Sequence, residues 1–347
     1  MTFFKRFSLI IILVISTLLT ACSPNFGRDS RLRDRVDSAQ IAAGVVSSAL
    51  LAETTTGDPG ATNEPGVVYI APDIESLRED LPRIDGSIMT IPITEGIYET
   101  ILGTDHATAA KIALHNGSSS AYDRLAEGST DIIFVTYPTK EDSEKIEALG
   151  LELDFIPIAR DGLVFMVNKE NSLSDVPAET LRGIYTGKIT AWKELGNSDL
   201  NIAAYQNPSN SYMQSLFLGL AMKDSIPMIA PMRKVTTEQD IVADVVASYS
   251  NAEDAIGFTS YYYAEKSYGT IERKLLAVDG IFPGPTSISS GSYPFSCDIY
   301  AAIPKGLDDK ESNVFTLISW LISEDGQWMM ERNGYVPLYA LDEEVEP

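Results

Sequence analysis

Asp85-Gly-Ser-Ile-Met-Thr-Ile-Pro92 is the most informative stretch of this chain, and apolar residues recur at helical spacing after it, over residues 93–101. Its Gly-Ser pair predicts a turn, and its proline suits the first turn of a helix. A helix that begins after a polar turn points unpaired backbone N–H groups and its positive dipole end outward. The stretch therefore indicates a site for an anion or polar ligand near Thr90 and Ile91. The alternative is an ordinary capped helix at the surface.

Downstream, short apolar runs alternate with helical patterns, as in α/β proteins. Ser118 lies at the start of a second predicted helix, and residues 131–136 form a continuous apolar run bounded by turn signals. Such a run is typical of a strand buried on both faces, and Thr136 is its carboxyl end. In open α/β sheets, ligands bind where strands end and helices begin. Farther on, residues 154–159 and 163–169 predict two strands separated by Asp161-Gly162.

Residues 1–21 are predicted to be a lipoprotein signal peptide. A basic start precedes an apolar core too short for a comfortable membrane span, and Leu-Thr-Ala-Cys ends the segment at Cys22. Resemblance to the bacterial lipoprotein pattern implies cleavage before Cys22 and a diacylglyceryl thioether on its sulfur, with palmitate among the expected acyl chains. The alternatives are a plain signal peptide and a single membrane anchor. Residues 22–75, rich in Thr, Gly, Pro and Asn toward their end, predict a flexible tether.

The composition limits the possible partners and chemistries. The 347 residues are 44% hydrophobic, enough for about two domains, and carry a formal net charge of −23. This charge disfavours nucleic acid and anionic lipid surfaces as partners, although local donors still allow a small anion. No nucleophile–base pattern is visible, so an enzyme is not expected, and no cofactor is implied. The two histidines, His106 and His115, are expected at the surface, and a metal site is not expected.

Five motifs together resemble a known family, and they occur in that family's order. They are Arg83-Ile-Asp-Gly-Ser87, Asp131-Ile-Ile-Phe-Val-Thr136, Ile158-Ala-Arg-Asp-Gly-Leu-Val-Phe-Met-Val-Asn168, Ile184-Tyr-Thr-Gly-Lys-Ile-Thr-Ala-Trp192 and Asn333-Gly-Tyr-Val-Pro-Leu338. The chain is similar to the phosphate-binding substrate-binding proteins of ABC transporters, in the branch found in Gram-positive bacteria.

This resemblance implies an α/β, two-lobed, periplasmic-binding-protein-like fold of type II. Each lobe is expected to be a mixed sheet flanked by helices, with the ligand cleft between the lobes. Two chain crossings are expected near residues 157–163 and 293–303. The implied boundaries are 76–160 and 300–347 for lobe 1 and 161–299 for lobe 2.

The resemblance also implies ligand contacts, residue by residue. Thr90 and Ile91 match the loop that offers a hydroxyl and N–H groups, and Ser118 matches the serine at the second helix start. Ser211, with its neighbour Asn210, matches a polar segment before a lobe 2 helix.

Four positions depart from the family pattern. Asn207 stands where the family has its phosphate-pairing arginine, Tyr212 stands for a glycine, and Met213 for a serine or threonine. Thr136 replaces an aspartate found in many members. Asparagine is neutral and short, whereas arginine offers a charged fork that matches phosphate, and methionine donates no hydrogen bond. The ligand is therefore expected to be another oxyanion or a small polar solute, which a ring such as that of Tyr212 could stack upon.

The implied function is a solute-binding lipoprotein of an ABC importer, held on the extracytoplasmic face of the cell membrane. Its implied partners are the permease subunits, a small polar or anionic solute, and the membrane through the lipid. The alternative is a surface sensor or adhesion protein that has kept the fold without serving a transporter. A permease gene beside this one would argue against that alternative.

Overall fold

The computed structural model describes residues 72–136, 138–207, 212–223, 225–229, 253–266, 273–307 and 312–341. The predicted signal peptide, Cys22 and nearly all of the predicted tether lie outside these residues. In the described part, each helix falls short of the length and apolar character that a membrane span requires.

One seven-stranded sheet runs through the described residues in the order β1-β2-β9-β3-β6-β5, with β7 also paired to β3. β1 and β2 are parallel, as are β5 and β6, whereas β9 and β3 run antiparallel to their neighbours. β4 (Asp175–Val176) and β8 (Ala277–Val278) form a separate parallel pair. The strands of the large sheet are β1 (Ile84–Gly86), β2 (Ile132–Thr136), β3 (Leu153–Asn168), β5 (Ala203–Ala204), β6 (Ala255–Ser260), β7 (Arg273–Leu275) and β9 (Ser296–Pro304).

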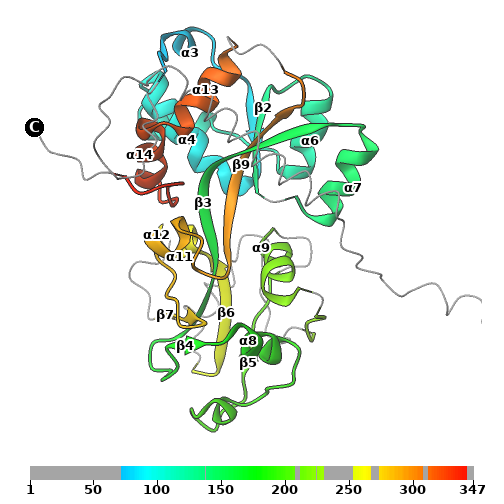
Figure 1. Cartoon of the computed structure of the whole chain (residues 1–347), viewed down its shortest axis with the longest axis vertical. Helices are drawn as coiled ribbons and strands as arrows, with labels where there is room; N and C mark the ends of the chain where they lie inside the picture. The colour runs from blue at the N-terminus through cyan, green and yellow to red at the C-terminus, as the bar shows by residue number, and fades with distance from the viewer. Residues whose placement is uncertain are drawn as a thin grey trace, which may run out of the picture. The chain divides into compact units, whose positions relative to one another are not determined.

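The prediction of two strands separated by Asp161-Gly162 is wrong, because β3 is one strand of sixteen residues. Asp161 pairs with Cys297 and Gly162 with Ser296, so the ladder to β9 continues through the pair. A glycine ends a strand only when its backbone turns away from the partner strand, and here it does not. Figure 1 shows β3 and β9 side by side along this ladder.

Lobe 1 is built on β1, β2 and the amino-terminal part of β3. The continuous apolar run of β2 is buried along its whole length, which confirms the predicted two-sided burial. Fully burying a side chain such as Ile93 or Ile97 contributes about 1.5 to 3 kcal/mol. The helices of this lobe are α3 (Glu75–Glu79), α4 (Ile91–Leu102), α5 (His106–Ile112), α6 (Ser118–Ala126), α7 (Lys140–Ala148), α13 (Asn313–Ile322) and α14 (Glu324–Arg332).

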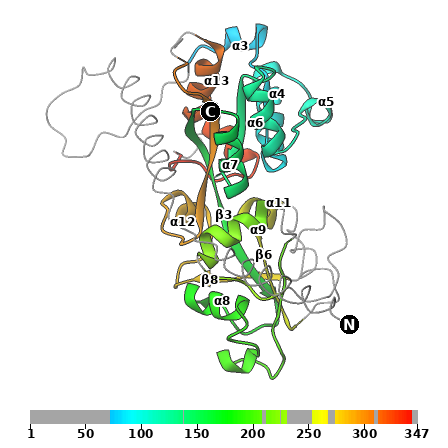
Figure 2. The same cartoon turned by 90° about the vertical axis from the view of Figure 1, so that its right-hand side faces the viewer.

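Lobe 2 is built around an aromatic core on the carboxyl-terminal part of β3. The Phe165 ring lies 5.7 to 6.4 Å from four other rings, and Phe217 stacks on Phe258 at 4.2 Å. Helix α11 lies beside β3 and β6 (Figure 2). The helices of this lobe are α8 (Ala178–Tyr185), the 3-10 helix η2 (Trp192–Leu195), α9 (Tyr212–Leu216), the π-helix η3 (Phe217–Met222), α11 (Tyr261–Lys266) and α12 (Pro285–Ser289).

Both β3 and β9 pass from one core to the other. On β3, Ala159 packs in the lobe 1 core and Leu163 in the lobe 2 core. Phe295, just before β9, belongs to the lobe 2 core, and Ile299 of β9 belongs to the lobe 1 core. These strands occupy the two segments where crossings were expected; the residue boundaries of the lobes stay a prediction.

Candidate functional site

The loop between β1 and α4 is the first part of the expected site. It contains the 3-10 helix η1 (Ile88–Thr90), and α4 begins at Ile91 with proline in its first turn, as predicted. A side chain at Gly86 would place its Cβ 2.1 Å from the Phe134 carbonyl oxygen, so only glycine lets β1 approach β2 this closely. The loop therefore starts from a position that the neighbouring strand determines.

The Thr90 hydroxyl is fully buried and makes its contacts within the protein. It lies 2.9 Å from the carbonyl oxygens of both Ser87 and Phe134. The Thr90 N–H donates to the Ser87 carbonyl, and the Ile91 N–H donates to the Ile88 carbonyl. These groups thus have internal partners in this structure. The roles of Thr90 and Ile91 as ligand contacts stay predictions.

The prediction that His115 lies at the surface is wrong, since its exposed fraction is only 8%. Its Nδ1 lies 2.8 Å from the Ser87 carbonyl oxygen, which only accepts, so Nδ1 carries the proton. Thr94 Oγ1 then donates to Nε2 over 2.9 Å. Burial lowers the pKa of His115, so the ring is neutral and holds the loop to α4. His106, by contrast, is exposed as predicted.

Asp85 ties the loop to the second helix start. Its carboxylate is 2% exposed and accepts from the Gly86 N–H at 2.7 Å and the Asn116 N–H at 2.8 Å. The Asn116 side-chain amide and the Arg124 guanidinium from α6 donate to the other oxygen, at 2.7 and 2.9 Å. These bonds hold the start of α6, with the half-buried Ser118 at its first position, against β1. The position of Ser118 at a helix start is confirmed.

Thr136 completes the lobe 1 half of the expected site. It is the last residue of β2 and is buried. Because β1 and β2 are parallel, with Gly86 opposite Phe134, the carboxyl ends of both strands meet at the same edge of the sheet. The structure therefore brings Thr90, Ile91, Ser118 and Thr136 to this edge.

The lobe 2 half contains Asn207, which follows β5. Its N–H donates to Gln214 Oε1 over 3.0 Å, and Gln214 Nε2 donates to Gln206 Oε1 over 2.9 Å. Gln206 Nε2 in turn donates to the Met228 carbonyl. The Asn207 side-chain nitrogen is buried and has no hydrogen-bond partner in the described part of the chain. Among the predicted contacts that the structure describes, it is the one buried side-chain atom without a hydrogen-bond partner.

Other predicted positions in lobe 2 fall partly or wholly outside the described residues. Ser211 and Asn210 lie outside them, and so does the side chain of Tyr212, although Tyr212 begins α9. Met213 is 6% exposed and packs in the lobe 2 core. The Met213 side chain therefore packs in the core and does not face a ligand.

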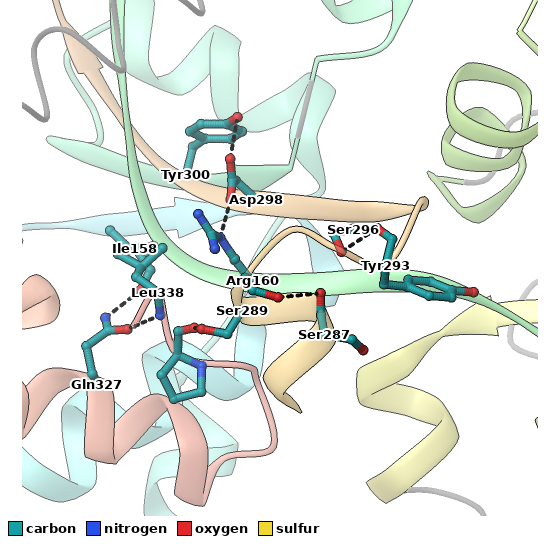
Figure 3. Close-up of polar contacts among 12 residues, drawn as sticks. Ile158, Arg160, Ser287, Ser289, Tyr293, Ser296, Asp298, Tyr300, Gln327 and Leu338 are labelled. Carbon is teal, nitrogen blue, oxygen red and sulfur yellow. Dashed lines mark hydrogen bonds and ion pairs between the residues drawn. The ribbon is translucent and has the colours of Figure 1, made fainter. Parts of the chain in front are cut away.

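Polar contacts at the crossing strands were not predicted (Figure 3). Arg160 Nε of β3 lies 3.1 Å from Asp298 Oδ1 of β9, and the Tyr300 hydroxyl donates to the same carboxylate. The next residue, Asp161, accepts from the Gly162 and Tyr262 N–H groups at 2.8 and 3.0 Å. Burial raises the pKa of the Asp161 carboxyl to about 6, and these hydrogen bonds oppose the rise.

Two further features bear on chemistry. The described residues contain no group of three or more His, Cys, Asp or Glu side chains placed to hold a metal ion. A surface pocket of about 280 Å³ lies at the far end of β1 and shares no residue with the expected site. Its lining residues are Asp80, Leu81, Pro82, Arg83, Asp131, Asn313 and Val314.

The sequence matches a known protein family over more than half of its length. The family model described as a PBP superfamily domain matches residues 104–325. The chain belongs to the PBP superfamily. The phosphate-binding protein PstS of Staphylococcus epidermidis is 28% identical over 261 residues, covering 73% of this chain and 77% of that protein. PstS of Staphylococcus saprophyticus is 28% identical over 266 residues, covering 74% and 80%.

Solved structures of other proteins share the fold of this chain. PstS from Borrelia burgdorferi is 23% identical, with a TM-score of 0.52, over 74% of this chain and 98% of that one. An ABC-type phosphate transport receptor from Vibrio cholerae is 24% identical, with a TM-score of 0.55, over 73% and 98%. At this identity the structures show the fold alone. The predicted two-lobed type II fold and the resemblance to phosphate-binding proteins are confirmed.

Proposed function

We propose that this chain is the extracytoplasmic solute-binding lipoprotein of an ABC importer, and that it delivers its solute to permease subunits. Membership of the PBP superfamily and the names of its relatives support a binding protein rather than an enzyme. The solute would lie between the lobes. The proposed contacts are Thr90, Ile91, Ser118, Thr136, Asn207, Ser211 and Tyr212.

The buried, unsatisfied side-chain nitrogen of Asn207 carries the proposal about the ligand. An unpaired buried donor costs about 1 to 3 kcal/mol, and a ligand that accepts a hydrogen bond there would recover this cost. Asparagine stands where the resemblance implies a phosphate-pairing arginine. A neutral amide favours an oxyanion of lower charge or a small polar solute over inorganic phosphate.

The proposed lobe boundaries are 76–160 with 300–347 for lobe 1, and 161–299 for lobe 2. The change of core between Ala159 and Leu163 supports the first boundary. The change between Phe295 and Ile299 supports the second. Two lobes joined by thin crossings would close on a ligand, because polar groups on both sides would then share it.

Calorimetry on the purified full chain tests the ligand. Inorganic phosphate, sulfate and a panel of neutral polar solutes are titrated separately, and phosphate is expected to bind more weakly than the best solute. An arginine at position 207 would make two charge-assisted hydrogen bonds to phosphate, each worth about 1.5 to 3 kcal/mol. Without them, the affinity for phosphate should be roughly 10²- to 10⁴-fold lower than in a site that has the arginine. A sub-micromolar phosphate affinity would contradict the ligand proposal.

Small-angle scattering tests whether the lobes close. At saturation with the best solute, the protein should show a smaller radius of gyration than without it; an unchanged radius would argue against closure.

The anchor is tested separately. If Cys22 is lipidated, Cys22→Ser releases the protein into the medium or leaves it unprocessed, since the lipid supplies the membrane affinity. Cys297→Ser, which changes the other cysteine, serves as the matched control and is expected to stay on the membrane. Equal membrane retention of both variants would contradict the anchor.

A further inference from the structure

The segment Tyr335-Val-Pro-Leu338, called the strap below, lies against the crossing strands. Its middle pairs with β3: the Arg160 N–H donates to the Val336 carbonyl over 2.7 Å, and the Val336 N–H donates back over 2.9 Å. Arg160 stands just where β3 leaves the lobe 1 core. The strap is therefore a third stretch of chain at the hinge, beside the two crossings that the sequence predicted.

The strap is held to lobe 1 by two side chains. The Tyr335 ring is 3% exposed and packs in the lobe 1 core. Its hydroxyl donates to the Met89 carbonyl over 2.5 Å. At the other end, the Leu338 N–H donates to Gln327 Oε1 over 2.7 Å, and Gln327 Nε2 donates to the Ile158 carbonyl over 2.8 Å (Figure 3).

The same segment is also held to lobe 2. Val336 is buried in the lobe 2 core, although its neighbour Tyr335 belongs to the lobe 1 core. Ser289 Oγ of α12 donates to the Pro337 carbonyl over 2.9 Å. The Tyr335 ring stacks on Tyr262 of α11, with ring centres 4.6 Å apart and planes 17° from parallel. The four residues of the strap together thus contact both lobes.

We propose that the strap couples the two lobes and that Tyr335 is a positioning residue for the ligand loop, residues 87–90. Met89 is the residue before Thr90, so the Tyr335 hydroxyl fixes the backbone that would meet a ligand in lobe 1. Stacking on Tyr262 and the Ser289 bond link the same strap to lobe 2. A displacement of lobe 2 therefore reaches the ligand loop through the strap. The ligand part of this inference rests on the proposed function.

A purely structural role makes a different prediction. If the strap only covers the hinge, weakening it lowers the stability of the whole protein and leaves the ligand loop no more mobile than other regions. If it positions the loop, weakening it mobilises the loop selectively. This must hold even when the change is made on lobe 2, at Ser289, on the other side of the hinge from Met89.

Amide hydrogen exchange on the unliganded full chain, followed by mass spectrometry, separates these cases. Tyr335→Phe removes the hydroxyl and keeps the stacked ring. The matched control is Tyr339→Phe, which removes a hydroxyl that donates to the Ile322 carbonyl over 2.9 Å, away from the loop. Tyr335→Phe is expected to speed exchange over residues 88–94 by about threefold to tenfold, the effect of one lost hydrogen bond. Tyr339→Phe should leave that region unchanged.

Ser289→Ala provides the second variant, so a poorly folded Tyr335→Phe does not leave the question open. It is expected to speed exchange over the strap and over residues 88–94, while peptides from α7 report any global change. Equal acceleration in α7 and the loop, or an unchanged loop in both variants, would overturn the proposal. Since no ligand is present, this result is independent of the calorimetry with inorganic phosphate, which alone decides the ligand.

Discussion

The two halves of the proposed ligand site differ in how fully their polar groups are satisfied. In lobe 1, the Asp85 carboxylate, the His115 ring and the Thr90 hydroxyl all have partners within the protein, which hold β1 and the loop before α4. In lobe 2, Gln206 and Gln214 fix the backbone of Asn207, but its buried side-chain nitrogen has no partner among the described residues. In the lobe 1 half, these polar groups are already satisfied by the protein. The second half keeps a buried donor that none of the described residues satisfies.

The difference between the two halves indicates which of them sets the ligand preference. A closed hydrogen-bond set mainly holds geometry, because its members have little capacity left for a ligand. An unpaired buried donor lowers the stability of the folded protein. Such a donor is therefore rare unless a ligand, a water molecule or an ion accepts its hydrogen bond. We therefore expect changes in lobe 1 to alter stability and changes at Asn207 to alter binding.

The largest effect is expected from Asp85→Ala. The N–H groups of Gly86 and Asn116, the Asn116 amide and the Arg124 guanidinium lose their acceptor, and a buried group such as the Gly86 N–H costs about 1 to 3 kcal/mol when left unsatisfied. The free energy of unfolding, measured in urea, should fall by about 3 kcal/mol or more. The control Glu75→Ala breaks an exposed ion pair with Arg78 and should cost less than about 1 kcal/mol. Similar losses in both variants would mean that the lobe 1 network does not hold the loop.

The second prediction concerns Asn207, in the lobe 2 half of the proposed site. Asn207→Arg restores a charged fork and is expected to raise the affinity for inorganic phosphate by at least about 100-fold, as measured by calorimetry. Asn201→Arg adds the same charge at an exposed position of lobe 2 and serves as the control. Met213 is left unchanged, because shortening this core side chain would open a cavity. An equal gain in both variants would show that net charge, not position, governs phosphate binding.

The third prediction concerns Asp161, which lies on β3 between Ala159 of the lobe 1 core and Leu163 of the lobe 2 core. Its folded pKa of about 6 lies above the ordinary value of 3.8, so the folded chain binds the proton more tightly than the unfolded chain. Stability from this group is therefore greatest at low pH and is lost as the pH rises from about 4 to 6. The total is about 2 to 3 kcal/mol, since one pKa unit corresponds to about 1.4 kcal/mol.

Asp161→Asn removes the charge and keeps an oxygen that can accept from the Gly162 and Tyr262 N–H groups. Its urea stability relative to the unmodified chain should therefore improve as the pH rises from 4 to 7. Other carboxylates titrate in both proteins and cancel in the difference. A difference that does not change across this range would contradict the raised pKa.

The smallest effect is expected from His115, whose pH dependence has the opposite sign. Burial lowers its folded pKa below the ordinary 6.5, so the unfolded chain binds the proton more tightly. Stability from the neutral ring is present above pH 6.5 and is lost as the pH falls through lower values. His115→Gln should lack this loss in urea unfolding between pH 5 and about 7.

His106 is the internal control for this sign. It is exposed, and a hydrogen bond and the charge of Glu99 raise its pKa. The stability that His106 contributes is therefore lost as the pH rises. His106→Gln should change the pH dependence of the free energy of unfolding in the direction opposite to His115→Gln. Shifts of the same sign in both variants would refute the buried, neutral assignment of His115.

Much of the fold was predictable because its signals are local. The helix start at Pro92, the second start at Ser118 and the buried strand ending at Thr136 all follow from patterns within a few residues. The five motifs that resemble the family are also short and contiguous. Periodicity, turn residues and helix-start residues act through backbone sterics and nearby burial, which the sequence displays directly.

The sequence by itself therefore determined the α/β class, the family and the positions of the helix starts. Only the tertiary structure decided that β3 runs unbroken through Asp161-Gly162, that His115 is buried, and that Tyr335 reaches Met89 across 246 positions of the chain. Each of these depends on a partner strand or side chain from a distant segment. No local pattern marks such a partner, because burial and hydrogen bonding are set by what the fold brings alongside, not by the neighbours in sequence.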